Sequence, residues 1–131
     1  MKYLPVCYAL FWLPPVWALT SITAGPVKSQ IGHANIRLNW TSDAAAFTRW
    51  GWDTVSHAGA SSSTAYANHY TSNAQHTVHG MYISGLTAST TYYYRVCAYN
   101  SLEVCAPEDT FTTLPLPNPH PALPTPPTAE S

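Results

Sequence analysis

The chain has 131 residues, of which 46% are hydrophobic and 8% are charged, and its five basic and six acidic side chains give a formal net charge of −1. A chain of this length builds one compact domain rather than two. A net charge this close to zero does not gather nucleic acid or an anionic membrane, so we expect no nucleic-acid partner.

The N-terminal segment has the pattern of a secretory signal peptide. Lys2 precedes an apolar run that ends near Val16, and small residues lead to a cleavage site after Ala18. A membrane anchor is the alternative, but the run is shorter than the ~20 residues of a spanning helix and is broken by prolines. We therefore predict a signal peptide over residues 1–18, a secreted or cell-surface chain, and no stable membrane insertion after cleavage.

Residues 22–113 have the pattern of short β-strands, because β-rich runs alternate with Gly, Ser, Asn and Asp and no helical periodicity is sustained. In ANIRLNWT, the apolar residues Ile36, Leu38 and Trp40 alternate with polar ones, as in a strand with one buried face. HGMYISGL repeats this pattern. Near residue 60, HAGASSSTA is small and polar, so we expect a long, flexible surface loop there.

Two cysteines remain after cleavage at Ala18, because Cys7 leaves with the signal peptide. An even number of cysteines in an oxidising compartment favours a disulfide. The separation of Cys97 and Cys105 is too wide for a Cys-x-x-Cys metal or redox site, but it suits two neighbouring strands joined by a loop. We predict a Cys97–Cys105 disulfide that pins a hairpin.

The composition changes after Thr113 to LPLPNPHPALPTPPTAES, whose closely spaced prolines exclude a helix or an interior strand. Such a segment favours extended polyproline II. We expect residues 115–131 to be a semi-rigid linker or tail, and a ligand for a proline-recognising module is the less favoured alternative. Whether the chain is complete or the front of a longer protein stays open.

The segment HGMYISGLTASTTYYYRVCAYN resembles part of a fibronectin type III domain. Leu86, Thr90 and Tyr92 fill three of the four positions of the family's Leu-x-Pro-x-Thr-x-Tyr motif, and Ala88 replaces the proline. Further likenesses, which extend the resemblance over roughly residues 22–115, are WT at Trp40-Thr41, RWG at Arg49 to Gly51 and DTFTTLP from Asp109. Within the family, the chain is similar to the fibronectin-like domains of purple acid phosphatases and of bacterial surface proteins and hydrolases.

This resemblance implies an all-β fold: a seven-stranded antiparallel Greek-key sandwich of immunoglobulin-like type, in a domain over residues 19–114. The resemblance also implies that this domain has no catalytic site of its own. The expected strands lie near 22–28, 34–41, 46–53, 65–71, 76–83, 91–100 and 104–113. The expected structural core includes Trp40, Trp50, Leu86, Tyr92 and Tyr94. Tyr92 is expected to make the tyrosine corner, in which its hydroxyl bonds to the upstream backbone.

Six histidines invite a metal hypothesis. His76 and His79 are three residues apart, which on a strand places them on opposite faces, and the other histidines lack partners at ligand spacing. No nucleophile motif such as Gly-x-Ser-x-Gly and no well-supported carboxylate pair occurs. We therefore predict that the chain is not an enzyme and has no catalytic residue, no metal and no cofactor.

Aromatic residues are the remaining lead. In the family register, Tyr93, Arg95, Cys97 and Tyr99 point outward. The aromatics that a ligand would contact are predicted to be Trp52, Tyr82, Tyr93 and Tyr99, because exposed rings stack on sugars or anchor a protein. The alternative is that outward tyrosines form cross-strand pairs that stiffen a sheet.

The leading hypothesis is a secreted, non-catalytic β-sandwich module that acts as a spacer or as an adhesion or protein-interaction unit. The alternatives are an accessory N-terminal domain of a truncated extracellular hydrolase, either purple-acid-phosphatase-like or a glycosidase, and a carbohydrate-binding module. A protein or a cell-surface glycan is the expected partner, and we expect a monomer. Asn39-Trp40-Thr41 matches the N-glycosylation pattern, and the sequence leaves open whether Asn39 is modified.

Overall fold

A computed structural model of the chain describes residues 20–119, 124 and 127–129. The predicted signal peptide, residues 1–18, lies outside the described residues. The strands are β1 (Ile22–Ser29), β2 (Ile36–Asp53), β3 (Asn68–Ile83), β4 (Thr91–Tyr99), β5 (Glu103–Cys105) and β6 (Asp109–Thr112), and a short 3-10 turn, η1 (Ser63–Ala65), precedes β3. The predicted all-β class is confirmed. The described part of the chain contains no helix that is long and apolar enough to cross a membrane.

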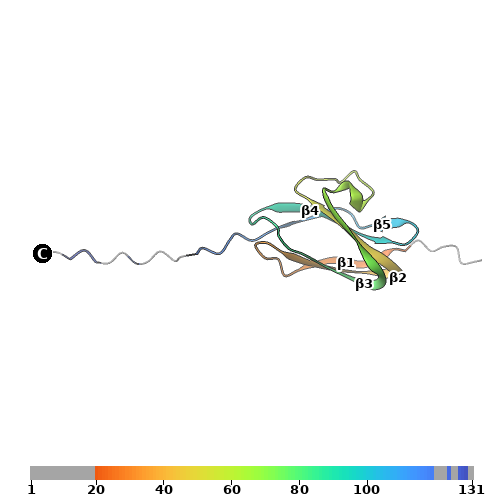
Figure 1. Cartoon of the computed structure of the whole chain (residues 1–131), viewed down its shortest axis with the longest axis horizontal. Coiled ribbons are helices and arrows are strands. Elements are labelled where there is room, and N and C mark those ends of the chain that lie inside the picture. Colours follow the sequence, from red (N-terminus) through yellow and green to blue (C-terminus); the bar gives the residue numbers. More distant parts are fainter. Residues whose placement is uncertain (1–19, 120–123, 125–126, 130–131) are drawn as a thin grey trace, which may run out of the picture.

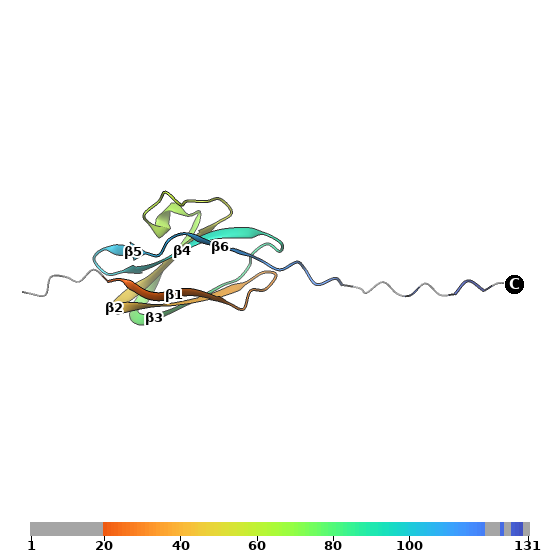
Figure 2. The ribbon, with the colours of Figure 1, turned by 180° about the vertical axis from the view of Figure 1, so that it is seen from behind.

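The strands form two layers that share β2 and β3 (Figure 1). The first half of β2 pairs with β1 and with the end of β3, whereas its second half pairs with the start of β3 and with β4. A register shift between Thr41 and Ala46 marks the corner at which β2 passes from one layer to the other. In the second layer, β4 also pairs with β5 and β6 (Figure 2).

The division into strands differs from the expected seven. Two pairs of expected strands are continuous, because β2 and β3 bend at the corner and remain extended. The last expected strand, 104–113, is split into β5 and β6. Pro107 lies between them, and a proline has no N–H to donate to a ladder. The sandwich is therefore held together by two long strands that belong to both sheets.

The hydrophobic core lies between the layers. Trp40 is 2% exposed, Tyr92 is 7% exposed and Tyr94 is fully buried, whereas Trp50 and Leu86 are partly buried and pack against the same cluster. The ring of Phe111 lies 5.4 Å from that of Tyr92. The Tyr92 hydroxyl accepts a hydrogen bond of 2.9 Å from the backbone N–H of Thr87, which is the tyrosine corner that the resemblance implies.

His79 fills the corner of the sandwich and is 1% exposed. Its Nε2 lies 2.8 Å from the Ser42 hydroxyl, and its Nδ1 lies 2.6 Å from the Thr48 hydroxyl. Because the Ser42 hydroxyl donates to the carbonyl of Ala44, it accepts from Nε2–H, and the Thr48 hydroxyl donates to Nδ1. Burial, together with the nearby His76, lowers the pKa of His79. A neutral histidine thus joins the two halves of β2.

Candidate interaction surfaces

The outer face of the second layer is covered by residues 54–67, which we call the covering loop; it lies over β2 and β4 in Figure 1. The sequence predicted Tyr93, Arg95, Cys97 and Tyr99 to point outward from this face. They do lie in its outer row, but Arg95 is only 8% exposed, Cys97 is fully buried, and both tyrosines are half-buried. The expected exposed row is therefore absent, because a loop distant in sequence from β4 lies on top of it.

Gly51 explains why the covering loop approaches the sheet so closely. A Cβ atom at this position would lie 2.3 Å from the carbonyl oxygen of Ser63 and 2.7 Å from the ring of Tyr66. Only glycine leaves room for these contacts. Within the expected surface loop HAGASSSTA, Ser63 is therefore buried, with 1% exposure, and the nearby Tyr66 is 2% exposed.

Glu103 of β5 holds one side of the covering loop. Its carboxylate accepts hydrogen bonds from the Ser62 hydroxyl at 2.7 Å and from both the backbone N–H and the hydroxyl of Ser63. The guanidinium of Arg49 lies 3.6 Å from the same carboxylate. Burial alone would raise the pKa of Glu103, but these hydrogen bonds and the Arg49 charge outweigh burial and lower it.

Glu108, which follows β5, holds the other side. Its carboxylate accepts hydrogen bonds from the Ser56 hydroxyl, the Tyr66 hydroxyl and the His57 backbone N–H, the last at 2.7 Å. Although burial opposes it, the pKa of Glu108 is lowered by these donors and by the charge of Arg95. Burial raises the pKa of Tyr66, so its hydroxyl keeps the proton that it donates to Glu108.

Contacts of Arg95 and Asp53 complete this polar layer. The buried guanidinium of Arg95 donates from Nη2 to the carbonyl of Ala58 at 3.3 Å. Asp53 accepts from His57 Nε2 at 2.9 Å and from the backbone N–H of Ala67 at 3.1 Å, and the contact with His57 is the main reason that the pKa of Asp53 is lowered. These charged side chains are engaged in holding the covering loop.

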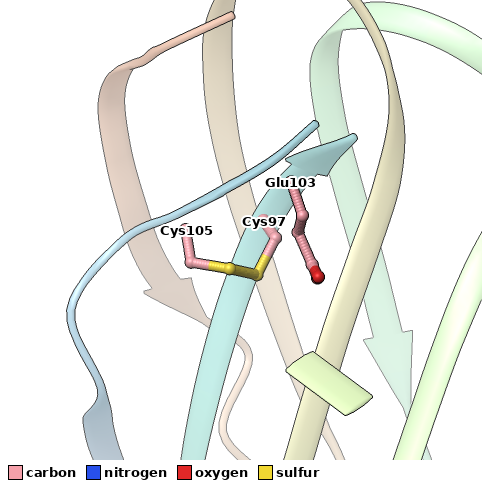
Figure 3. Close-up of side chains that lie close together, drawn as sticks. All are labelled: Cys97, Glu103 and Cys105. Atoms are coloured by element: carbon pink, nitrogen blue, oxygen red, sulfur yellow. A yellow bond between two sulfur atoms is a disulfide. The ribbon is translucent and has the colours of Figure 1, made fainter. Parts of the chain in front are cut away.

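The predicted disulfide is confirmed. Cys97 and Cys105 are directly paired residues of β4 and β5, with Cα atoms 4.0 Å apart. Together with Glu103 they form the one cluster of three potential metal ligands among the described residues (Figure 3). The sulfur atoms are bonded to each other, so neither is a thiolate that can bind a metal. The bridge joins β5, and hence Glu103, to the face under the covering loop.

The four predicted ligand-contacting aromatics do not form one surface. Trp52 lies in the inner row of β2, where it is partly buried and packs against the core. Tyr93 is half-buried on the covered face, and the ring of Tyr99 lies 3.6 Å below the guanidinium of Arg49. Tyr82 of β3 is 57% exposed. A ligand-binding role for these residues as a group stays a prediction, and Tyr82 is the member that borders a cavity.

This cavity is a groove of about 490 Å³ along β3. Trp50 and Tyr70 are cross-strand partners in its wall, with ring centroids 4.4 Å apart. Tyr70 is 49% exposed and Val78 is 70% exposed. The lining residues are Thr48, Trp50, Tyr70, Ser72, His76, Val78, Gly80, Met81 and Tyr82. The sequence assigned Trp50 to the core alone, because no sequence pattern reveals the β2–β3 register that places Tyr70 opposite Trp50.

The arrangement of two sheets around an aromatic core with a tyrosine corner is that of a fibronectin type III-like β-sandwich. The fibronectin type III domain of the human KIAA0970 protein is similar, with a TM-score of 0.50 and 17% identity, covering 86% of this chain and 82% of that chain. The fibronectin type III domain of human fibronectin type III domain containing protein 3 has a TM-score of 0.48 and 18% identity, covering 75% of this chain and 86% of that chain.

At such low identity a structural likeness shows the fold alone. The family is shown by sequence, because the family model of the purple acid phosphatase N-terminal domain matches residues 28–113, which is more than half of the chain. The chain therefore belongs to the purple acid phosphatase N-terminal domain family. No curated protein matches it significantly.

Proposed function

We propose that the chain is an exported, non-catalytic module that acts as a spacer or as an adhesion or protein-interaction unit. The observation that carries this proposal is the state of its carboxylates. In residues 20–119 every carboxylate accepts hydrogen bonds from the fold: Asp43, Asp53, Glu103, Glu108 and Asp109. A general acid or base must exchange its proton with a substrate, and carboxylates held by structural donors are poorly suited to that task.

Export is supported by the leader-like pattern of residues 1–18 and by the Cys97–Cys105 disulfide, since disulfides persist in oxidising compartments. To test it, the chain is expressed with its own leader in a secreting host. We expect a product in the medium that begins at Leu19 and has no free thiol. An intracellular product with free Cys97 and Cys105 would contradict export.

The non-catalytic role is tested on the purified chain with p-nitrophenyl phosphate, with and without added iron and zinc. We expect no turnover above that of buffer. Turnover that disappears in the Glu108→Gln variant, or when the protein is unfolded, would overturn the proposal. A glycan array probed with the same protein tests the carbohydrate-binding alternative, for which the aromatic groove beside Tyr70 and Tyr82 is the supporting feature.

The family match favours a second role, as an accessory domain beside a hydrolase, because the family is described as the N-terminal domain of an enzyme. The coding sequence downstream of residue 131 separates the two roles. A reading frame that continues into a metallophosphatase domain supports the accessory role, and a stop codon supports the independent module.

A further inference from the structure

The edge of the sandwich formed by β3 is open. In the described part of the chain β3 pairs only with β2, so along its 16 residues one side of its backbone has no strand beside it. An unpaired edge presents a row of N–H and C=O groups that another extended chain can use. The groove described above runs along this same strand and adds exposed side chains, including Tyr70, Val78 and Tyr82.

The other sheet edges carry features that hinder strand addition. β1 contains Pro26 and Lys28, and its register shifts twice against β2. β5 and β6 are three and four residues long. β3 is different, since its sequence NHYTSNAQHTVHGMYI contains no proline, lysine, arginine or carboxylate. Short length, proline and edge charges are usual protections of an edge strand, and β3 has none of these three, although its register against β2 also shifts, between Val78 and His76 and between Gln75 and Thr71.

The segment that follows β6 has a complementary property. In LPLPNP, residues 114–119, a proline stands at every second position. Successive residues of an extended strand point their N–H groups to opposite sides, so the N–H groups of Leu114, Leu116 and Asn118 all point to one side and the prolines occupy the other. The segment can therefore add to a sheet edge without losing a single ladder hydrogen bond.

Leu114 already uses both of its backbone groups within its own domain, in bonds to two different loops, so Leu116 and Asn118 are the residues that remain to pair with an edge. Its N–H donates to the carbonyl of Gly32 at 2.9 Å, and its carbonyl accepts from the N–H of Ser89 at 3.2 Å. Leu116 and Asn118 continue the pattern, and among the described residues neither has a hydrogen-bond partner. The side chain of Leu116 is 67% exposed. The segment runs away from the domain and not back along β3 (Figures 1 and 2), so it does not cover the β3 edge of its own copy.

We propose that this segment of one copy adds as a strand to the β3 edge of a second copy, with Leu116 seated in the groove beside Tyr70, Val78 and Tyr82. The uncharged edge lets a second chain approach without repulsion, and burial of Leu116 against aromatic rings drives the contact. The contact joins two different surfaces, so copies associate head to tail. This inference goes beyond the proposed function, since it needs neither export nor an outside partner, and it proposes association where the sequence analysis expects a monomer.

The test uses the full chain in sedimentation-velocity runs over a concentration series. We expect association that increases with concentration. We expect this association to be lost in Leu116→Asp, which places a charge on the added strand, and in Val78→Lys, which places a charge on the β3 edge. A mixture of the two variants should associate again, because the first keeps an intact edge and the second keeps an intact segment. Leu102→Asp and Val55→Lys are matched controls at exposed sites away from both surfaces and should associate as the parent does.

Circular dichroism and urea unfolding establish that each variant is folded. A parent chain that stays monomeric at every concentration would overturn the proposal. It would also be overturned by a mixture that fails to associate, by loss in only one of the two variants, or by equal loss in the controls. None of these outcomes depends on whether the chain is exported or catalytically inert, so failure here leaves the proposed function to its own tests.

Discussion

The covered face of the second layer and the open edge of β3 both adjoin β2, but they differ in whether their polar groups are paired within the fold. On the covered face a buried arginine, two glutamates and a tyrosine are joined in one hydrogen-bonded layer under the covering loop. Along the β3 edge no charged residue occurs, and large apolar side chains are exposed. A buried charge is tolerated only where it is paired, and on the covered face this pairing fixes the covering loop in place. The β3 edge has no charge that would repel a partner, so it stays open to strand addition.

The largest expected effect comes from Gly51→Val, which forces the covering loop off the sheet. Because the new side chain meets the backbone of Ser63, the structure must shift, and we expect the free energy of unfolding to fall by about 3 kcal/mol in urea titrations. Gly59→Ala is the control, since a Cβ there has no neighbour within 4 Å. Equal stability of the two variants would show that the loop does not pack on the sheet.

Removal of the disulfide with Cys97→Ala and Cys105→Ala comes next. The bridge closes a loop of eight residues, and its loss is expected to lower the free energy of unfolding by about 2 kcal/mol. The same loss should follow reduction of the parent protein, measured by the urea midpoint under reducing conditions. Parent and double variant should then coincide, and a remaining difference would mean that the substitutions do more than remove the bridge.

Glu108→Gln weakens the hydrogen bonds that hold the covering loop, and it should lower the free energy of unfolding by about 1 kcal/mol. The more specific result is faster hydrogen exchange at the backbone N–H of His57, which loses its carboxylate partner. Exchange at the backbone N–H of Leu86, which donates to the carbonyl of Ala34 and not to the covering loop, should be unchanged. Uniform acceleration at both sites would indicate global destabilisation instead of release of the loop.

The free energy of unfolding should decrease in two separate steps as the pH is lowered. The pKa of His79 is lowered in the fold, so the unfolded chain takes up a proton first as the pH falls below 6.5, and the free energy of unfolding decreases until the folded pKa is reached. The pKa of Glu108 is also lowered, so a second loss begins as the pH falls below 4.5. Urea midpoints measured against pH should show both steps, and His79→Gln should remove the upper one. A variant that keeps the upper step would assign it to another group.

The smallest effect on stability is expected for Tyr82→Lys, at an exposed position of the open edge. The free energy of unfolding should change by less than about 0.5 kcal/mol. This small change in the free energy of unfolding contrasts with that of Gly51→Val, because the new side chain at position 82 points into solvent and the one at position 51 meets a packed face. A large loss in Tyr82→Lys would mean that the edge is already part of the folded core.

The sequence predicted those features that depend on short-range pattern. The two-residue alternation of Ile36, Leu38 and Trp40 predicted a strand with a buried face, and all three are buried. The spacing of Cys97 and Cys105 predicted the disulfide. The division into strands was harder to predict from the sequence. The bend in β2 depends on contacts with β3 and on the buried His79, and the periodicity of the sequence does not reveal such contacts.

The covered face could not be predicted from such patterns. Ser62 and its partner Glu103 are 41 residues apart, and nothing in HAGASSSTA indicates that a distant carboxylate will hold it. The pairing of Trp50 with Tyr70 likewise depends on the β2–β3 register. Long-range partners of this kind decide which aromatic rings are exposed: Trp52 packs against the core, Tyr93 keeps its outward row but is half-buried there, and Tyr82 borders the groove.

The continuity of β2 and β3 through both layers also has a mechanical consequence. β1 begins at one end of the sandwich, and the proline-rich segment leaves at the other (Figure 2). A pulling force applied between these points acts along the strands, and it loads the β1–β2 and β4–β6 ladders in shear. The two sheets cannot slide apart under such a load without bending the strands that they share, so the sandwich should bear tension as a single stiff unit.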